Sequence, residues 1–186
     1  IMPDPVELEQ AAQALAKAKA PLIIAGGGVQ YGDAIEELRA FAERHQIPVV
    51  ETIAGRANLL WDHPLNCGPI GVTGSESANN LANLADVVLC VGTRLQDFTT
   101  GSWSVFALES ALIKINPARF DALKHRGTAV VAGAKESLPA LSALMGAFHS
   151  SPAWLATAQH ENASWALIRA RNTDSQQGPN RYAQVI

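Results

Sequence analysis

Short apolar runs alternate along the chain with longer segments in which apolar residues recur every three or four positions. The most distinct run, residues 87–91, contains no polar residue, which is typical of a strand whose sheet is covered by helices on both faces. Gly92 ends this run, and a polar loop follows it as far as Trp103. Similar runs predict strands at residues 21–25, 47–51, 111–116 and 128–131, and one short strand fits within 67–72.

Helical spacing of apolar residues predicts that helices separate these strands. The helices are expected to begin near residues 5, 33, 76, 118, 135 and 152. Asp4 is expected to cap the first helix and to form a capping box with Glu7, and Ser75 is expected to cap the third. Ile35 and Leu144 occupy positions that are predicted to face inward.

Strands that alternate with helices in this order are typical of an α/β fold. We therefore predict a doubly wound, six-stranded parallel sheet over residues 1–150, a Rossmann-like domain with three α/β/α layers. Residues 151–186 are predicted to form a C-terminal helix and a linker toward a missing catalytic domain, because 176–180 is linker-like and both ends look cut from a longer polypeptide. Trp154 and Trp165 on this helix either pack on the domain or form an interface.

The composition of the chain argues against several classes of protein. Hydrophobic residues make up 48% of the chain and charged residues 17%, which argues against disorder. A formal net charge of −3 provides no basic footprint for nucleic acid. No apolar run approaches the roughly 18 residues that a membrane-spanning helix needs. We therefore expect a protein that binds neither nucleic acid nor membranes, and its two cysteines without paired spacing favour a cytoplasmic, reducing compartment.

The residue types that carry metal or nucleophilic chemistry are scattered. The five histidines and the two cysteines, Cys67 and Cys90, have no metal-ligand spacing. Cys90 lies within the buried run and is expected to act as a small hydrophobic residue. No G-x-S-x-G motif is present. The sequence predicts neither a metal site nor catalytic residues within this chain.

A glycine run follows the first predicted strand, at Gly26, Gly27 and Gly28. A strand, a glycine-rich turn and a helix are the context of a dinucleotide-binding fingerprint, and Glu51 occupies the place of the acid that binds a ribose hydroxyl. The spacing differs from that fingerprint, because Tyr31 stands where the third glycine belongs. An NAD-binding protein and a tight turn that needs glycine conformations are both compatible with this run.

The polar loop after residue 91 lies where α/β folds bind ligands, at the carboxyl end of a central strand. Arg94 and Asp97 within it either pair as an anion clamp or satisfy the backbone groups of the loop itself. The second arrangement is the commoner one in loops of this kind. The sequence leaves open whether the loop holds a ligand or a neighbouring domain.

Several segments in fixed order resemble the central domain of thiamine-diphosphate-dependent enzymes. They cover roughly residues 5–148 and comprise 20–28, 47–49, 71–74, 85–89 with 92–94, and 113–116. Within this family, GTRLQDFTTGSWSVF (92–106) and INPARFDALKH (115–125) look most like a hydrolase of myo-inositol breakdown that opens a cyclic dione by cleaving a carbon–carbon bond. The resemblance implies a cytoplasmic parent enzyme with thiamine diphosphate and magnesium.

The family likeness also implies a division of labour within the parent enzyme. The catalytic glutamate and the diphosphate and magnesium sites belong to the domains that flank the central one. We therefore expect this fragment to be inactive and to bind no cofactor by itself. Its expected partners are the flanking catalytic domains of the same chain, within a homo-oligomer of the parent.

Flavin-containing relatives, such as acetolactate synthase, hold FAD or ADP in the central domain. The resemblance carries this site over to Gly26, Gly27, Gly28, Gly71, Gly74, Arg94 and Asp97. Relatives carry acids where this chain has Lys114, Asn116 and Gly133, so the usual acceptors for ribose hydroxyls are missing. We expect a vestigial cleft, with the segment 99–103 touching a neighbouring domain. An FAD- or ADP-binding domain remains the alternative.

Overall fold

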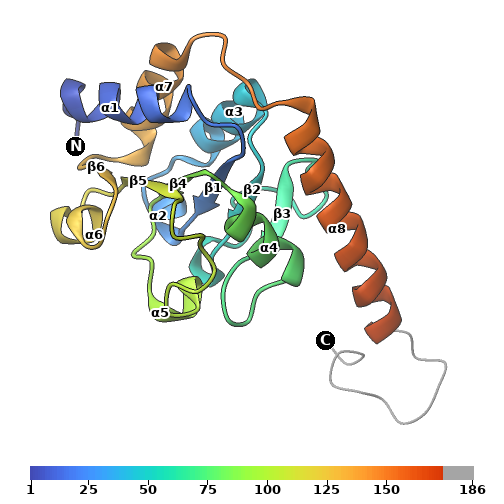
Figure 1. Cartoon of the computed structure of the whole chain (residues 1–186). Helices are drawn as coiled ribbons and strands as arrows, with labels where there is room; N and C mark the ends of the chain where they lie inside the picture. Colours follow the sequence, from blue (N-terminus) through green and yellow to red (C-terminus); the bar gives the residue numbers. More distant parts are fainter. Residues whose placement is uncertain (174–186) are drawn as a thin grey trace.

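Residues 1–173 are described by the structure, a computed structural model, and they form a parallel sheet with helices on both faces (Figure 1). The strands are β1 (Pro21–Ala25), β2 (Val49–Glu51), β3 (Asn66–Pro69), β4 (Val87–Val91), β5 (Ala111–Ile115) and β6 (Thr128–Val130). The longer helices are α1 (Pro5–Leu15), α3 (Ile35–His45), α4 (Glu76–Leu84), α7 (Ala134–Met145) and α8 (Pro152–Thr173). The short ones are α2 (Gly27–Tyr31), α5 (Asp97–Thr100), α6 (Arg119–Leu123) and the 3-10 helix η1 (Ile53–Gly55).

The strand order β3-β2-β1-β4-β5-β6 confirms the predicted doubly wound, six-stranded sheet. All neighbouring strands pair in parallel, and β1 lies beside β4 over its whole length, from Pro21 opposite Val87 to Ala25 opposite Val91. The chain leaves β1 toward β2 and leaves β4 in the opposite direction toward β5. This reversal opens a crevice above the carboxyl ends of β1 and β4, which is the usual ligand position in such sheets.

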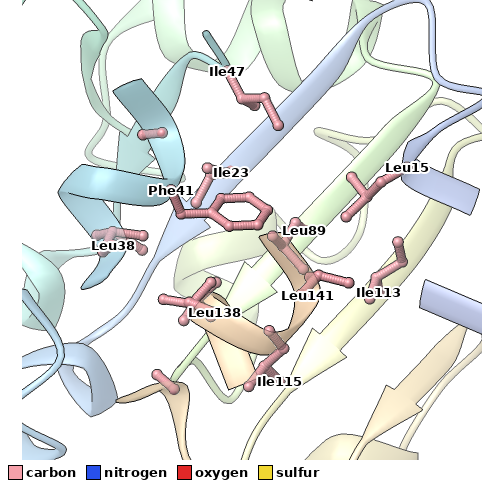
Figure 2. Close-up of a cluster of buried hydrophobic side chains, with 14 of the residues drawn as sticks. Leu15, Ile23, Leu38, Phe41, Ile47, Leu89, Ile113, Ile115, Leu138 and Leu141 are labelled. Carbon is pink, nitrogen blue, oxygen red and sulfur yellow. The ribbon is translucent and has the colours of Figure 1, made fainter. Parts of the chain in front are cut away.

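The sheet divides the hydrophobic core in two, because successive strand residues point to opposite faces. One face carries Ile23 and Leu89 and packs against α1, α3 and α7, where Phe41 is buried between helix and sheet (Figure 2). The other face packs against α4 and the first turns of α8. There the buried Trp154 donates its indole N–H to the carbonyl of Pro21, at an Nε1–O distance of 2.8 Å. Trp154 therefore packs on this domain.

The local helix signals are confirmed in part. The carboxylate of Asp4 caps α1 by accepting hydrogen bonds from the amides of Val6 and Glu7, and the Ser75 hydroxyl caps α4. The predicted capping box of Asp4 with Glu7 is wrong. Instead, Glu7 Oε2 accepts a hydrogen bond of 2.8 Å from the amide of Val131, next to β6. The carboxylate thus joins α1 to the far edge of the sheet.

Other differences from the predicted elements are small. Ile35, at the first position of α3, and Leu144, beside the buried Met145, are exposed rather than inward-facing. The helices α2 and α5 have five and four residues, too few for their helical spacing to be recognised in the sequence. The predicted linker at 176–180 lies outside the described residues. Within residues 1–173, no helix is both long and apolar enough to span a membrane.

Candidate functional site

A cleft of about 800 Å³ lies at the carboxyl ends of β1, β4 and β5, and we call it the switch-point cleft. Its walls are α2, η1, the loop after β4, the loop after β5 and the start of α7. Gly27, Gly28 and Arg94 of the candidate site line it, whereas Gly26, Gly71, Gly74 and Asp97 lie outside the lining. The structure therefore brings only part of the residues that the family resemblance assigned to a nucleotide site together at the switch-point cleft.

The glycine run allows a close backbone contact. The amide of Gly28 donates a hydrogen bond of 2.9 Å to the carbonyl of Gly92, and the amide of Gly26 donates one of 2.8 Å to the carbonyl of Val91. A Cβ on Gly26 would lie 2.3 Å from the Gly92 oxygen, and a Cβ on Gly28 would lie 2.7 Å from Gly92 Cα. Glycine is therefore required here by the chain's own packing, and the Gly28 amide is already engaged.

Gly71 and Gly74 shape the connection between β3 and α4. Gly71 has a φ of +109°, and a Cβ there would lie 2.2 Å from the carbonyl oxygen of Phe98. The same carbonyl accepts a hydrogen bond of 2.8 Å from the amide of Val72. A Cβ on Gly74 would lie 2.5 Å from the carbonyl oxygen of Pro69. Gly71 holds this connection against α5, Gly74 allows its close turn onto Pro69, and neither glycine lines the switch-point cleft.

Arg94 and Asp97 do not form the anion clamp that the sequence left open. Arg94 is exposed on the wall of the cleft, and Asp97 is the first residue of α5. Among residues 1–173, the ion pairs do not include one between these two side chains. The Asp97 carbonyl accepts hydrogen bonds within its own turn, from the amides of Gly101 and Ser102. Asp97 contributes to the fold of the loop, and Arg94 remains a cation on the wall of the cleft.

Glu51 does not reach the cleft either. Its Oε1 accepts a hydrogen bond of 2.9 Å from the amide of Leu59, and its side chain is buried. Burial raises the pKa of this carboxyl, although hydrogen bonds from the amides of Leu59, Ala57 and Asn58 partly oppose the shift. The carboxylate therefore organises the loop after η1. It does not occupy the ribose position that an NAD site needs.

The side chains of Lys114 and Asn116, near the carboxyl end of β5, form hydrogen bonds with backbone carbonyls and amides. Lys114, only 2% exposed, donates from Nζ to the carbonyls of Lys124 and His125, and burial lowers the pKa of its amine. Asn116 lines the cleft, donates to the carbonyl of Thr93 and accepts from the amide of Ala118. These side chains hold the loops in place instead of offering carboxylates to a ribose.

Exposed apolar side chains surround the switch-point cleft. Tyr31, Ile53 and Phe98 all line it and are 88%, 61% and 63% exposed. Val72, which is joined to Phe98 by a backbone hydrogen bond, is also exposed. We call these four residues the carboxyl-edge surface. Exposed apolar residues gathered at one edge of a domain are typical of an interaction surface.

The segment 99–103, which the sequence predicted to touch a neighbour, packs in part on its own domain. Thr100 is buried and donates its hydroxyl to the carbonyl of Gln96. The Trp103 ring lies 4.0 Å from the His125 ring, measured between centroids. Phe98, one residue before this segment, is a large apolar side chain that the loop exposes. Contact with a neighbour stays a prediction, and Phe98 is the residue that sequence reasoning did not single out.

The described residues offer no cluster for metal or thiolate chemistry. Within residues 1–173, no group of three or more His, Cys, Asp and Glu side chains converges as a metal site would require. Cys67 and Cys90 are buried, and burial raises the pKa of each thiol to about 12. A thiol with such a pKa is not a nucleophile at neutral pH. Cys90 thus acts as a core residue, as its apolar strand predicted.

Comparisons with known proteins identify the family. A family model described as "Thiamine pyrophosphate enzyme, central domain" matches residues 8–141. The 3D-(3,5/4)-trihydroxycyclohexane-1,2-dione hydrolase of Bacillus cereus (strain AH820) is 44% identical over 141 residues, which cover 75% of this chain and 22% of the relative. The hydrolase of the same name from Bacillus thuringiensis (strain Al Hakam) is 44% identical over 138 residues, which cover 74% of this chain and 21% of the relative.

The chain thus spans about a fifth of the length of these curated relatives. The family match covers all six strands and ends within α7, so it includes every residue that lines the switch-point cleft. The resemblance that the ordered sequence segments indicated is confirmed. This chain belongs to the family of thiamine pyrophosphate enzyme central domains.

Proposed function

We propose that this chain is the central, non-catalytic domain of a thiamine-diphosphate-dependent hydrolase that cleaves a carbon–carbon bond in an inositol-derived cyclic dione. The observation that carries the proposal is the 44% identity to 3D-(3,5/4)-trihydroxycyclohexane-1,2-dione hydrolase over 75% of the chain. The matched part of that relative is 22% of its length. The catalytic activity therefore belongs, in this proposal, to a longer polypeptide of which this domain is one part.

Thiamine diphosphate supplies an ylid carbon that can add to a carbonyl group when the cofactor is bound. Its magnesium ion requires oxygen ligands, which proteins supply mainly from carboxylates and amides. No cluster of three or more potential ligands from His, Cys, Asp and Glu is present among residues 1–173. The carboxylate that lines the switch-point cleft, Asp121, is paired with Lys124 at 3.0 Å, and we place the metal and its diphosphate in the flanking domains.

In this proposal the domain spaces and orients the two flanking catalytic domains. The carboxyl-edge surface supports that role, because an apolar rim that is exposed in the isolated domain would be buried by a docked neighbour. The rigid parallel sheet beneath it fixes the positions of Tyr31, Ile53 and Phe98, which follow three neighbouring strands. We expect the parent to assemble as a homo-oligomer in the cytoplasm.

A nucleotide-holding domain with FAD or ADP in the switch-point cleft is the alternative that the sequence left open. The geometry gives it no specific support. The Gly28 amide, which would face a pyrophosphate, is bonded to Gly92, and the ends of β5 present Lys114 and Asn116 instead of carboxylates. We therefore propose that the cleft holds no flavin in the parent enzyme.

Isothermal titration calorimetry of the 186-residue chain tests where the cofactor binds. Titration with thiamine diphosphate and Mg²⁺ is expected to give no binding heat, and the parent polypeptide is expected to bind under the same conditions. Micromolar binding by the chain alone would contradict the proposal. A yellow preparation of the parent, or a thermal shift of the chain with ADP, would instead favour the nucleotide alternative.

A further inference from the structure

A second cleft lies beside β3 at the edge of the sheet, between the loop after η1 and α8. Its volume is about 280 Å³, and it shares no lining residue with the switch-point cleft. We call it the edge cleft. Two arginines and two tryptophans, Arg56, Trp61, Trp165 and Arg169, are among its lining residues. The family match ends at residue 141, so α8, which forms one wall, lies outside the matched segment.

The wall on α8 is a single face of that helix. Asn162, Trp165, Ala166 and Arg169 all line the cleft, and their spacing of three, four and seven residues places them on one side. The amide of Asn162 donates a hydrogen bond of 3.2 Å from Nδ2 to the carbonyl of Asn66 in β3. This bond fixes the rotation of α8, so the indole and the guanidinium on its face are directed to the cleft.

The opposite wall is held by the buried carboxylate of Glu51. Its Oε1 accepts a hydrogen bond of 2.9 Å from the amide of Leu59, the fourth residue of the loop. Ala57 has a φ of +69°, a left-handed conformation that is unfavourable for a residue other than glycine. The hydrogen bond between Glu51 and Leu59 ties the loop to β2 just after this residue, and the amide of Asn58 donates to the carbonyl of Gly55. Arg56, which precedes the strained residue, and Trp61 are thereby presented from a preorganised loop.

The charge of the edge cleft is positive. Neither Arg56 nor Arg169 forms an ion pair with an acidic side chain among residues 1–173. Glu51 also lines the cleft, but its carboxylate is directed at the loop amides. Guanidinium groups bind carboxylates and phosphates through paired hydrogen bonds, and indole rings provide flat faces for stacking.

From these four side chains we infer that the edge cleft binds a small aryl anion, a single ring system that carries one carboxylate or phosphate group. The volume of about 280 Å³ suits a ligand of that size. The ring would contact Trp61 and Trp165, and the anionic group would be bound by Arg56 and Arg169. This site is separate from the proposed catalytic function, since it needs neither the flanking domains nor thiamine diphosphate.

The test is an NMR titration of the 186-residue chain that follows the indole N–H signals. Phenyl phosphate and phenylacetate serve as the two aryl anions. Inorganic phosphate and phenol represent the anionic half and the aromatic half of phenyl phosphate. We expect both aryl anions to shift the signals of Trp61 and Trp165 and to bind at least about tenfold more tightly than either half. The tighter of the two anions identifies the preferred acidic group.

Arginine variants locate the site. Arg169→Gln is expected to weaken phenyl phosphate binding by about tenfold or more, because it removes a charge-assisted hydrogen bond. Arg94→Gln removes an exposed arginine from the switch-point cleft instead and is expected to leave binding unchanged. Both variants should keep the wild-type melting temperature. Equal weakening by both variants, unshifted Trp61 and Trp165 signals, or inorganic phosphate binding as tight as phenyl phosphate would each overturn the inference.

Discussion

The backbone amide of Gly28 lies 2.9 Å from the carbonyl oxygen of Gly92 and donates a hydrogen bond to it. This bond joins the first turn after β1 to the turn after β4 at the point where the chain reverses direction across the sheet. The two glycine-bearing turns touch because neither has a side chain between them. A motif that is associated with phosphate binding thus serves here to hold the turns after β1 and β4 together.

Gly28→Ala is expected to destabilise the domain, because the added Cβ would lie 2.7 Å from Gly92 Cα and backbone must move. We expect a loss of about 1–3 kcal/mol in the free energy of unfolding, measured by urea denaturation. Gly133→Ala is the matched control, since its Cβ would crowd the end of the flexible Glu136 side chain and would meet backbone only at an ordinary 3.8 Å, at the Ile1 oxygen. The control should stay within about 0.5 kcal/mol of wild type. Equal losses would argue against the backbone contact as the cause.

Trp154→Phe tests whether the start of α8 belongs to the domain core. The substitution removes the indole N–H that bonds to the carbonyl of Pro21 and leaves this buried acceptor without a partner. We expect the free energy of unfolding to fall by about 1–3 kcal/mol. Trp165→Phe changes a half-buried indole on the same helix and should cost less than about 1 kcal/mol. The prediction fails if the two variants unfold at the same urea concentration.

The buried His45 should make the stability of the domain depend on pH. Its Nδ1 donates to the carbonyl of Phe148 at 2.7 Å, so Nε2 is left to accept from the hydroxyl of Ser142 at 2.8 Å. Burial lowers the pKa of His45 below its usual value of 6.5. The unfolded chain therefore binds a proton more readily than the folded one, and stability should fall as the pH is lowered from 6.5 toward the folded pKa.

Urea denaturation at several pH values between 7.5 and 5 measures this dependence. The loss of stability on acidification should be smaller in His45→Gln than in wild type, because the titrating group is absent. His160→Gln, which changes an exposed histidine of α8, is the control and should keep the wild-type slope. A wild-type slope in His45→Gln would show that another group causes the acid sensitivity.

The strand positions could be predicted from local pattern alone. The apolar runs at 21–25 and 87–91 match β1 and β4 because strands buried on both faces leave no polar position. Lys114 also lies in a buried strand, and only the tertiary structure reveals that its long side chain reaches the carbonyls of Lys124 and His125. The role of Glu7 was mispredicted for the same reason, since the amide of Val131 is distant in sequence.

The candidate site could be predicted only in part. Its location followed from the glycine run after residue 25 and the polar loop after residue 91, because α/β folds bind ligands at the carboxyl ends of their strands. The exclusion of Gly71 and Asp97 from the lining depends on how the connection before α4 packs against α5, which no local pattern encodes. The edge cleft was not predicted at all, because it depends on the docking of α8 beside β3.

The carboxyl-edge surface predicts an effect that appears only in the parent polypeptide. Phe98→Ser should leave the stability of the isolated chain within about 0.5 kcal/mol of wild type, because the side chain is 63% exposed. In the parent it should weaken domain docking, measured as faster limited proteolysis between domains. Leu108→Ser is the control. Leu108 is also exposed but lies just before the amino end of β5, so this variant should digest at the wild-type rate. Equal digestion of the two variants would argue against docking at this edge.

The most direct test of the proposed function is the turnover of 3D-(3,5/4)-trihydroxycyclohexane-1,2-dione, measured side by side for the 186-residue chain and for the parent polypeptide. Both are assayed with thiamine diphosphate and Mg²⁺. We predict that the parent opens the ring in a reaction that depends on thiamine diphosphate and that the chain alone gives no turnover. Turnover by the isolated chain, or a parent that leaves the dione unchanged when loaded with the cofactor, would contradict the assignment.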